Sequence, residues 1–175
     1  MPSRSKPDYT LRRPRPGDMG WVVQRHGEIY AQAYGWNWEF EGLVAGVVSQ
    51  FVKNFDAKRE RCWIAERNGK NVGAIFCVKK TATEARLRML FVDKEARGLG
   101  LGSRLVDECI AFARRAGYRK MTLWTESPLT AARRIYAAAG FRIASREPVR
   151  SFGKRMVSEI WELDLRGPAA SRNPR

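Results

Sequence analysis

LFVDKEARGLGLGS, residues 90–103, is the stretch that decides the fold of this chain. A short apolar run leads into three glycines at alternate positions from Gly98 to Gly102, and a helical pattern begins near Ser103. Glycine lets a backbone take unusual dihedrals and approach a ligand closely, while the free N–H groups at a helix start attract anions. Arg97 adds a cation with several hydrogen-bond donors. The stretch therefore predicts a pyrophosphate site between a strand and a helix.

The composition is that of one soluble globular domain. The chain has 175 residues, 44% of them hydrophobic and 29% charged, and no apolar run approaches the about 20 residues that cross a bilayer. Its N-terminal segment lacks the apolar core of a secretory signal. The three cysteines, Cys62, Cys77 and Cys109, lie far apart in apolar patterns, so we interpret them as reduced core thiols without a metal or a disulfide. We expect a cytoplasmic protein without membrane contact.

Nearly half of the net charge of +15 lies in the two ends of the chain. Residues 1–16 hold five basic side chains and one acid, and residues 166–175 hold three basic side chains and no acid. We predict a basic flexible arm over 1–16, a folded domain over 17–165 and a basic flexible tail over 166–175. Such ends are more often solvated than bound to nucleic acid, so nucleic-acid binding is the lesser alternative. The positive charge left on the domain suits a ligand with several phosphates.

Two helices are predicted in the first third of the chain. Met19 to Val23 is predicted as a short strand, and the helix that follows it ends at Gly35. A second helix begins at the cap residue Asn37 and carries one broad apolar face as far as Phe55.

Beyond the second helix the apolar period changes from that of a helix toward that of a strand. Two strands flank the dipeptide Asn68-Gly69, which is favoured in hairpin turns. A third strand over residues 84–92 alternates, and it is expected to place Leu87, Met89 and Phe91 on one face. The three strands predict an antiparallel meander whose last strand enters the glycine loop.

The second half of the chain alternates helices and strands. A helix runs from the glycine loop to Gly117, a strand covers residues 120–125, and Ser127-Pro128 starts another helix. The last two strands are expected over residues 141–145 and 157–165, with a turn region between them. The order of elements predicts an α+β, or mixed α/β, fold with one sheet.

Two other classes of glycine motif do not fit the loop. A dinucleotide fold needs GxGxxG after the first strand of a βαβ unit and an acid about 20 residues later, whereas here GLGLG follows a meander in mid-chain. A nucleotide-triphosphate loop needs Gly-Lys-Ser/Thr, and Gly102-Ser103-Arg104 lacks the lysine.

The glycine loop resembles the acyl-CoA loop, R/Q-x-x-G-x-G/A, of the GNAT superfamily of acyl-CoA-dependent N-acyltransferases, with the residues Arg97-Gly98-Leu99-Gly100-Leu101-Gly102. The preceding LFVD resembles the family's strand, and IYAAAGF, residues 135–141, resembles its later I/L-Y-x-x-x-G-F segment. The likeness covers roughly residues 17–165. More narrowly, segments such as RCWIAE and LWTESPLTAARRIYAAAGF resemble the acetyltransferase half of bacterial fusion proteins that join a MarR-type regulator to a GNAT domain.

The resemblance implies a GNAT-like fold, with a mostly antiparallel sheet splayed between its fourth and fifth strands and helices on both faces. It also implies acetyl-CoA as the acyl donor. The donor's pantetheine arm would bond to the strand, and its pyrophosphate would be held by the loop. The implied donor-binding residues are Leu90, Phe91, Val92, Arg97, Gly98, Leu99, Gly100, Leu101, Gly102 and Ser103. Backbone N–H near Leu90 or Phe91 could stabilise the developing oxyanion.

The resemblance also assigns catalytic roles. Tyr136 matches the family's tyrosine near the cofactor sulfur, so it is the predicted general acid for the leaving thiolate, and a core tyrosine is the alternative. Glu126, just after the fifth strand, is the predicted base, although it could simply complement the helix start that follows. His26, the only histidine, is expected to be structural. Leu129 departs from the family, which often has an Asn there that bonds the cofactor arm.

The acceptor site is expected near the first two helices. Tyr34, Trp36 and Arg88 are the predicted acceptor-binding residues, although the aromatic cluster could instead be core or the face of a homodimer. Arg88 with Arg86 favours an acceptor with a carboxylate, whereas a free acid in the cleft would favour a cationic amine. We expect acetyl transfer to a primary amine of a small molecule or amino acid, by direct attack in a ternary complex. The alternatives are a protein or peptide amine, and a non-enzymatic regulator that senses acyl-CoA and binds nucleic acid.

Overall fold

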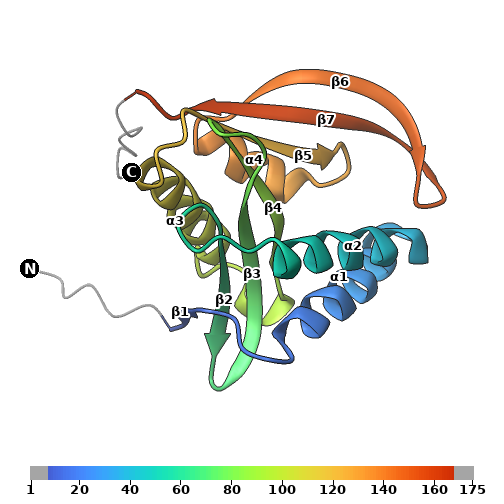
Figure 1. The fold of residues 1–175 in the computed structure, drawn as a ribbon. Coiled ribbons are helices and arrows are strands. Elements are labelled where there is room, and N and C mark those ends of the chain that lie inside the picture. Colours follow the sequence, from blue (N-terminus) through green and yellow to red (C-terminus); the bar gives the residue numbers. More distant parts are fainter. Residues whose placement is uncertain (1–7, 168–175) are drawn as a thin grey trace, which may run out of the picture.

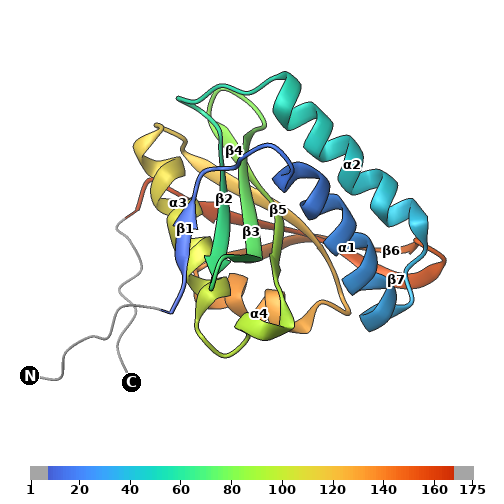
Figure 2. The same cartoon turned by 90° about the horizontal axis from the view of Figure 1, so that it is seen from below.

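A seven-stranded mixed sheet forms the middle of the protein, in the order β1-β2-β3-β4-β5-β7-β6. The computed structural model describes residues 8–167. Along the chain the elements are β1 (Thr10–Arg12), α1 (Asp18–Tyr34), α2 (Trp38–Lys53), β2 (Arg61–Arg67), β3 (Lys70–Lys79), β4 (Glu84–Val92), the 3-10 helix η1 (Lys94–Ala96), α3 (Leu101–Arg115), β5 (Lys120–Glu126), α4 (Thr130–Ala138), β6 (Arg142–Ser151) and β7 (Lys154–Asp164). Helices α1 and α2 cover one face of the sheet, and α3 and α4 cover the other (Figure 1 and Figure 2). The predicted α+β fold is confirmed.

The first helix begins earlier than the sequence pattern suggested. Met19 to Val23, predicted as a strand, lies in the first turns of α1. The prediction was wrong because Val22, His26 and Ile29 are buried at helical spacing, so the apolar period of 3.6 residues already starts inside that short run. Two predictions about the helix ends are confirmed. Gly35 ends α1 in a left-handed conformation, and the side chain of Asn37 caps α2 by accepting a hydrogen bond from the backbone N–H of Glu39.

A short strand lies within the segment predicted as a flexible arm. Strand β1 pairs antiparallel with β2, with Leu11 opposite Ala65. Arg12 then forms ion pairs with Asp18 at 2.7 Å and with Glu66 at 2.8 Å. The segment predicted as a flexible arm thus contains a paired strand, which the ladder to β2 and the ion pairs of Arg12 with nearby Asp18 and distant Glu66 hold in place. Residues 1–7 and 168–175, the rest of the predicted arm and tail, lie outside the described residues.

The meander of β2, β3 and β4 is confirmed, but its last strand does not alternate throughout. Asn68 and Gly69 both have positive φ, as a two-residue hairpin turn requires. In β4 the register with β3 shifts at a β-bulge, where Met89 has φ +55°. Leu87 therefore packs under α3 and α4, whereas Phe91 packs under α1 and α2. Their predicted placement on one face was wrong because the bulge adds one residue to the strand.

Strands β4 and β5 pair only at their start. They run parallel over residues 84–87 and 120–123, and beyond Leu87 and Leu123 the two strands share no ladder. The predicted splay is confirmed. On the other side of β5, β6 and β7 form a longer hairpin than predicted, with its turn at Phe152-Gly153 and Pro148 inside the edge strand β6. Proline is tolerated there because an edge strand needs no second ladder partner.

Two apolar layers hold the helices to the sheet. Cys77 and Cys109 lie in the layer under α3 and α4, and Cys62 lies in the layer under α1 and α2. All three cysteines are free and buried, as predicted. No helix within residues 8–167 has the length and apolar character that a membrane span needs.

Candidate active site

The glycine loop presents unpaired backbone donors at the start of α3. Gly98 and Gly100 have positive φ, and Gly100 is the N-cap of α3 without a side-chain cap. The helix begins at Leu101, two residues before the predicted start, and its ladder opens with the Arg104 N–H donating to the Gly100 carbonyl at 3.0 Å. The N–H groups of residues 101–103 therefore have no partner within the helix. With no acid in the first turn, this end of α3 is suited to an anion.

The third glycine of the loop allows two helices to approach closely. A Cβ on Gly102 would lie 2.8 Å from Cδ1 of Ile135 in α4 and 3.6 Å from Cγ2 of Val92. Because real side chains do not come that near, glycine at this position lets the start of α3 pack directly on α4. The loop, α4 and the end of β4 thus form one wall.

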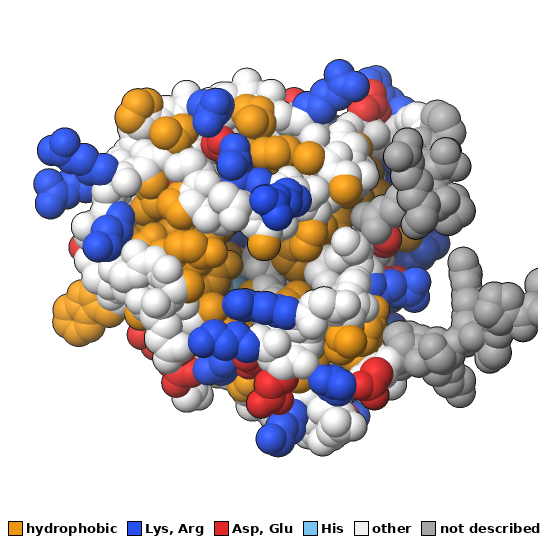
Figure 3. Space-filling view, turned by 180° about the vertical axis from the view of Figure 1, so that it is seen from behind, with side chains coloured by type: hydrophobic (Ala, Val, Ile, Leu, Met, Phe, Trp, Pro, Cys, Tyr) orange, Lys and Arg blue, Asp and Glu red, His pale blue; other side chains and the backbone are white. Residues whose placement is uncertain are grey.

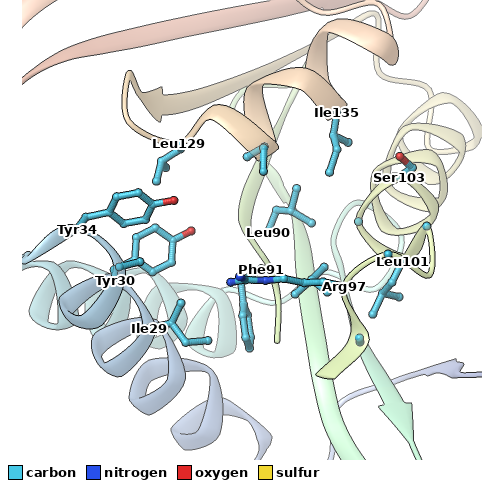
Figure 4. A pocket seen from close by; sticks show the side chains of 18 residues that line it. Ile29, Tyr30, Tyr34, Leu90, Phe91, Arg97, Leu101, Ser103, Leu129 and Ile135 are labelled. Carbon is cyan, nitrogen blue, oxygen red and sulfur yellow. The ribbon is translucent and has the colours of Figure 1, made fainter. Parts of the chain in front are cut away.

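That wall borders a first cavity of about 430 Å³ between α1, β4, α3 and α4 (Figure 4). Tyr30 and Tyr34 point into it from α1, and the Arg97 side chain extends across it from the loop. The predicted donor-binding residues that line it are Leu90, Phe91, Val92, Arg97, Gly98, Gly100, Leu101, Gly102 and Ser103. Leu99 does not line it and is 39% exposed. Tyr30 was not among the predicted site residues. Its position one helical turn before Tyr34 was the sequence signal that the two side chains share one face of α1 and line the same cavity.

Figure 3 shows the molecule from behind the view of Figure 1. Hydrophobic side chains gather around a hollow in the middle of this face, and Lys and Arg side chains lie around its rim. An apolar hollow with a cationic rim suits a ligand that has an apolar arm and an anionic end.

A second cavity of about 420 Å³ lies where β4 and β5 separate. Residues 86–89 of β4 line this cavity, whereas residues 90–92 line the first, so the bulge at Met89 divides the strand between the two. The adjacent residues Ile135 and Tyr136 of α4 divide in the same way, with Ile135 in the first cavity and Tyr136 in the second. One strand and one helix therefore contribute to both cavities.

Tyr136 lines the second cavity directly beside Ile135, which lines the first. Its side chain is buried, and burial raises the pKa of its hydroxyl. No hydrogen bond from residues 8–167 engages that hydroxyl, which leaves it available to a ligand in the second cavity. The ring packs against Phe141 and Trp161, and these contacts fix its direction.

Glu126 is buried at the end of β5, and burial with the nearby charge of Glu159 raises its pKa to about 7. Neither of its carboxyl oxygens has a hydrogen-bond partner within the described chain. Glu126 lines neither cavity. His26 is buried as well, its Nδ1 is 2.7 Å from the carbonyl of Val22, and burial lowers its pKa to about 4. The imidazole is neutral and packs edge-on against Phe91 at 4.9 Å.

The remaining predicted acceptor residues fall in different places. Trp36 is only 4% exposed and packs against Tyr30, Phe40 and Phe152, so its place is in the core and it lines neither cavity. Arg88 lines the second cavity and the groove beside α2. Within residues 8–167 no group of His, Cys, Asp and Glu could hold a metal ion.

Comparison with known proteins identifies the family. The model of the acetyltransferase (GNAT) family matches residues 3–141. The chain belongs to this family. The GNAT chain is 34% identical to N-acetyltransferase 8 from Homo sapiens over 101 residues, which are 54% of this chain and 44% of that protein. It spans about half the length of the curated relatives it matches.

Solved GNAT structures share the fold. The structure of yncA from Salmonella typhimurium, with its cofactor acetyl-CoA, covers 94% of this chain and 98% of its own at 20% identity and a TM-score of 0.68. A GNAT acetyltransferase from Staphylococcus aureus Mu50 covers 90% of this chain and 99% of its own at 17% identity and a TM-score of 0.73. The chain is thus a member of a family of N-acetyltransferase enzymes and has their fold.

Proposed function

We propose that this GNAT protein transfers acetyl from acetyl-CoA to a primary amine of a small molecule or amino acid, by direct attack in a ternary complex. The observation that carries the proposal is the pair of cavities on β4, one beside the glycine loop and one beside Tyr136. Two substrates can therefore approach one strand edge from two sides.

The first cavity fits the acyl donor. Pyrophosphate suits the free N–H groups of residues 101–103 and the Arg97 guanidinium. The pantetheine arm suits the edge of β4 over residues 88–92, because β5 has left the ladder there and the strand can bond to a ligand instead. Acetyl-CoA thus reaches the gap between β4 and β5 with its thioester near the bulge.

Acetyl transfer requires that the leaving thiolate gains a proton and that the amine nitrogen loses one. The amine nitrogen attacks the thioester carbonyl carbon, so a C–N bond forms, the C–S bond breaks and the thiolate leaves. The Tyr136 hydroxyl donates a proton to that thiolate, and backbone N–H of Leu90 or Phe91 stabilises the oxyanion. Burial raises the pKa of Tyr136, so its hydroxyl carries a proton when the thiolate leaves.

The amine must also lose a proton, and Glu126 is our candidate base. A pKa of about 7 suits a group that takes protons at neutral pH. Since Glu126 lines neither cavity, it would act through intervening water rather than by direct contact.

Two other functions remain as proposals. A peptide or protein amine is supported by a groove of about 740 Å³ beside α2, which shares Leu43, Arg86 and Arg88 with the second cavity and offers room for a longer acceptor. An acyl-CoA-sensing regulator that binds nucleic acid through its basic ends is supported by the net charge of +15, nearly half of which lies in the two ends of the chain. Cytoplasmic location and a homodimer stay predictions.

A thiol-release assay with acetyl-CoA across amines, amino acids and peptides tests the proposal, beside a salt-dependent DNA titration. We expect turnover with a small amine or amino acid and weak DNA binding. Turnover with peptides alone would favour the second function. No turnover with any acceptor, together with tight DNA binding that is abolished by removing residues 1–7, which leaves β1 in place, would favour the regulator.

A further inference from the structure

The second cavity carries positive charge and no acid. Lys80, Arg86 and Arg88 line it, and no Asp or Glu is among its described lining residues. Lys80 is paired with Glu84 at 2.9 Å. Arg86 and Arg88 are both half-buried, and no ion pair or hydrogen bond within residues 8–167 engages either guanidinium.

An unpaired arginine in this position is costly to the protein alone. Burial lowers the pKa of Arg88, and the like charge of Arg86 lowers it further. Removing a charge from water without a counterion is unfavourable, whereas an anion brought by a ligand would compensate it. The charge of Arg88 is thus expected to be stabilised by an anionic group of a bound ligand, because no group of the described chain pairs with it.

Acids in the adjoining groove form no ion pair with Arg88 in the described chain. Asp56 and Glu60 line that groove together with Arg88. The Asp56 carboxylate accepts the backbone N–H of Lys58 at 2.9 Å, and the Glu60 carboxylate accepts that of Lys79 at 3.0 Å. These carboxylates are engaged by the backbone of the loop after α2 and the end of β3.

The same cavity offers two further polar groups. Tyr136 lines it from α4, and Thr122 lines it from β5. Thr122 is 2% exposed, and its hydroxyl oxygen has no hydrogen-bond partner within the described chain. A ligand in the cavity would therefore meet two unpaired hydroxyl groups and an unpaired guanidinium.

We propose that the acceptor is an amine that also carries a carboxylate, an amino acid by class, whose carboxylate binds Arg88 while its amine lies near Tyr136. The proposal rests on the proposed acetyltransferase function and names its acceptor. Guanidinium binds carboxylate through two parallel hydrogen bonds, which would orient the acceptor as well as hold it. The cavity of about 420 Å³ has the size of a small-molecule site.

The test compares each amino acid with the amine left when its carboxylate is removed. Thiol release is measured with acetyl-CoA for wild type, Arg88→Met and Arg88→Lys. Arg61→Met is the matched control, because Arg61 is also half-buried on the sheet, stacks on Phe112 and lines none of the cavities. A second readout, independent of turnover, is the shift in Tm that the amino acid and its N-acetyl product cause in each variant.

We expect wild type to favour an amino acid over its decarboxylated amine by about 100-fold in kcat/KM, or about 2.8 kcal/mol, because hydrogen bonds between charged groups are among the stronger ones. Arg88→Met should remove this preference mainly through KM and abolish the Tm shift, and Arg88→Lys should restore part of both. Arg61→Met should keep the preference.

Three results would overturn the acceptor class: equal turnover of the decarboxylated amines, equal losses for both acceptors in Arg88→Met, or a preference for an amine with a phosphate in place of the carboxylate. A Tm shift that depends on Arg88, without turnover of any acceptor, would keep the carboxylate site and reject the acetyltransferase function.

Discussion

The two cavities on β4 are built from different parts of the chain. The first depends on backbone groups: the positive φ of Gly98 and Gly100, the free N–H groups of residues 101–103 and the unpaired edge of β4. The second depends on side chains from five elements, and Arg88 and Tyr136 are the polar groups to which we assign roles. The difference suggests that the donor, with a fixed pyrophosphate and arm, is held by backbone geometry, while the acceptor is selected by side chains.

The boundary between the two regions is the bulge at Met89. A non-glycine residue with φ +55° costs on the order of 1 kcal/mol or more, so the surrounding ladder must hold it in place. By adding one residue, the bulge reverses which side chains of β4 face each layer. It thereby lets one strand present residues 86–89 to one cavity and residues 90–92 to the other.

Replacing the hydroxyl at the second cavity separates chemistry from donor binding. Tyr136→Phe should lower kcat by about ten-fold or more, since the thiolate loses its proton donor. The Kd for acetyl-CoA should stay within about two-fold, because the hydroxyl lies outside the first cavity. Steady-state kinetics and titration calorimetry measure the two quantities. An unchanged kcat and pH–rate profile would leave Tyr136 as a core residue only.

Replacing a loop glycine should have the reverse effect. Gly100→Val forces a β-branched residue toward φ +71°, at a cost on the order of 1–3 kcal/mol, so the loop relaxes and its N–H groups move. The Kd for acetyl-CoA should rise by about ten-fold while kcat at saturation changes little. Gly20→Ala is the control, since Gly20 is helical and has open space at its Cβ. If both variants bind acetyl-CoA like wild type, the loop does not hold the donor.

The glycine loop and the helix start of the proposed donor site could be predicted from sequence because their features are local. Glycine spacing and a helix start depend on consecutive residues, so residues 90–103 predicted this loop before any tertiary contact was known. The same holds for the Asn68-Gly69 turn and the Asn37 cap.

What the sequence did not predict depends on contacts between distant segments. The bulge at Met89 exists only against β3, and β1 forms by pairing with β2, more than 50 residues away in the sequence. The convergence of Arg88 and Tyr136 on one cavity likewise follows from the splay of β4 and β5. For Trp36 the sequence left both a core position and an acceptor contact open, because the same aromatic residue in a helix joint can be buried or exposed, and the structure buries it.

Glu126 provides a test that does not depend on either cavity. Its folded pKa of about 7 lies above the usual carboxyl value, so between about pH 4.5 and 7 the unfolded chain has lost this proton while the folded chain keeps it. Stability should fall across that window, with a slope of up to about 1.4 kcal/mol per pH unit, and level off above it. In Glu126→Gln the fall should be smaller, as measured by urea unfolding from pH 5 to 8.

The same variant tests the base. If Glu126 takes the amine proton, Glu126→Gln should remove the limb near pH 7 from the profile of kcat/KM. A retained limb, beside a changed stability profile, would make Glu126 a structural carboxyl and leave proton removal to another group.

Leu129 should give the smallest effect, because it changes one contact of the donor site. It is half-buried, lines the first cavity and is the N-cap of α4 without a side-chain cap. In Leu129→Asn the amide can bond either to the donor arm or to α4, so we expect the Kd for acetyl-CoA to fall by about three-fold, or the unfolding free energy without ligand to rise by about 0.5–1 kcal/mol. Leu129→Ala removes the same apolar contact without adding an amide. If both variants weaken binding equally, the leucine side chain itself packs on the donor, and this wall of the first cavity recognises the donor by apolar contact rather than by a polar bond.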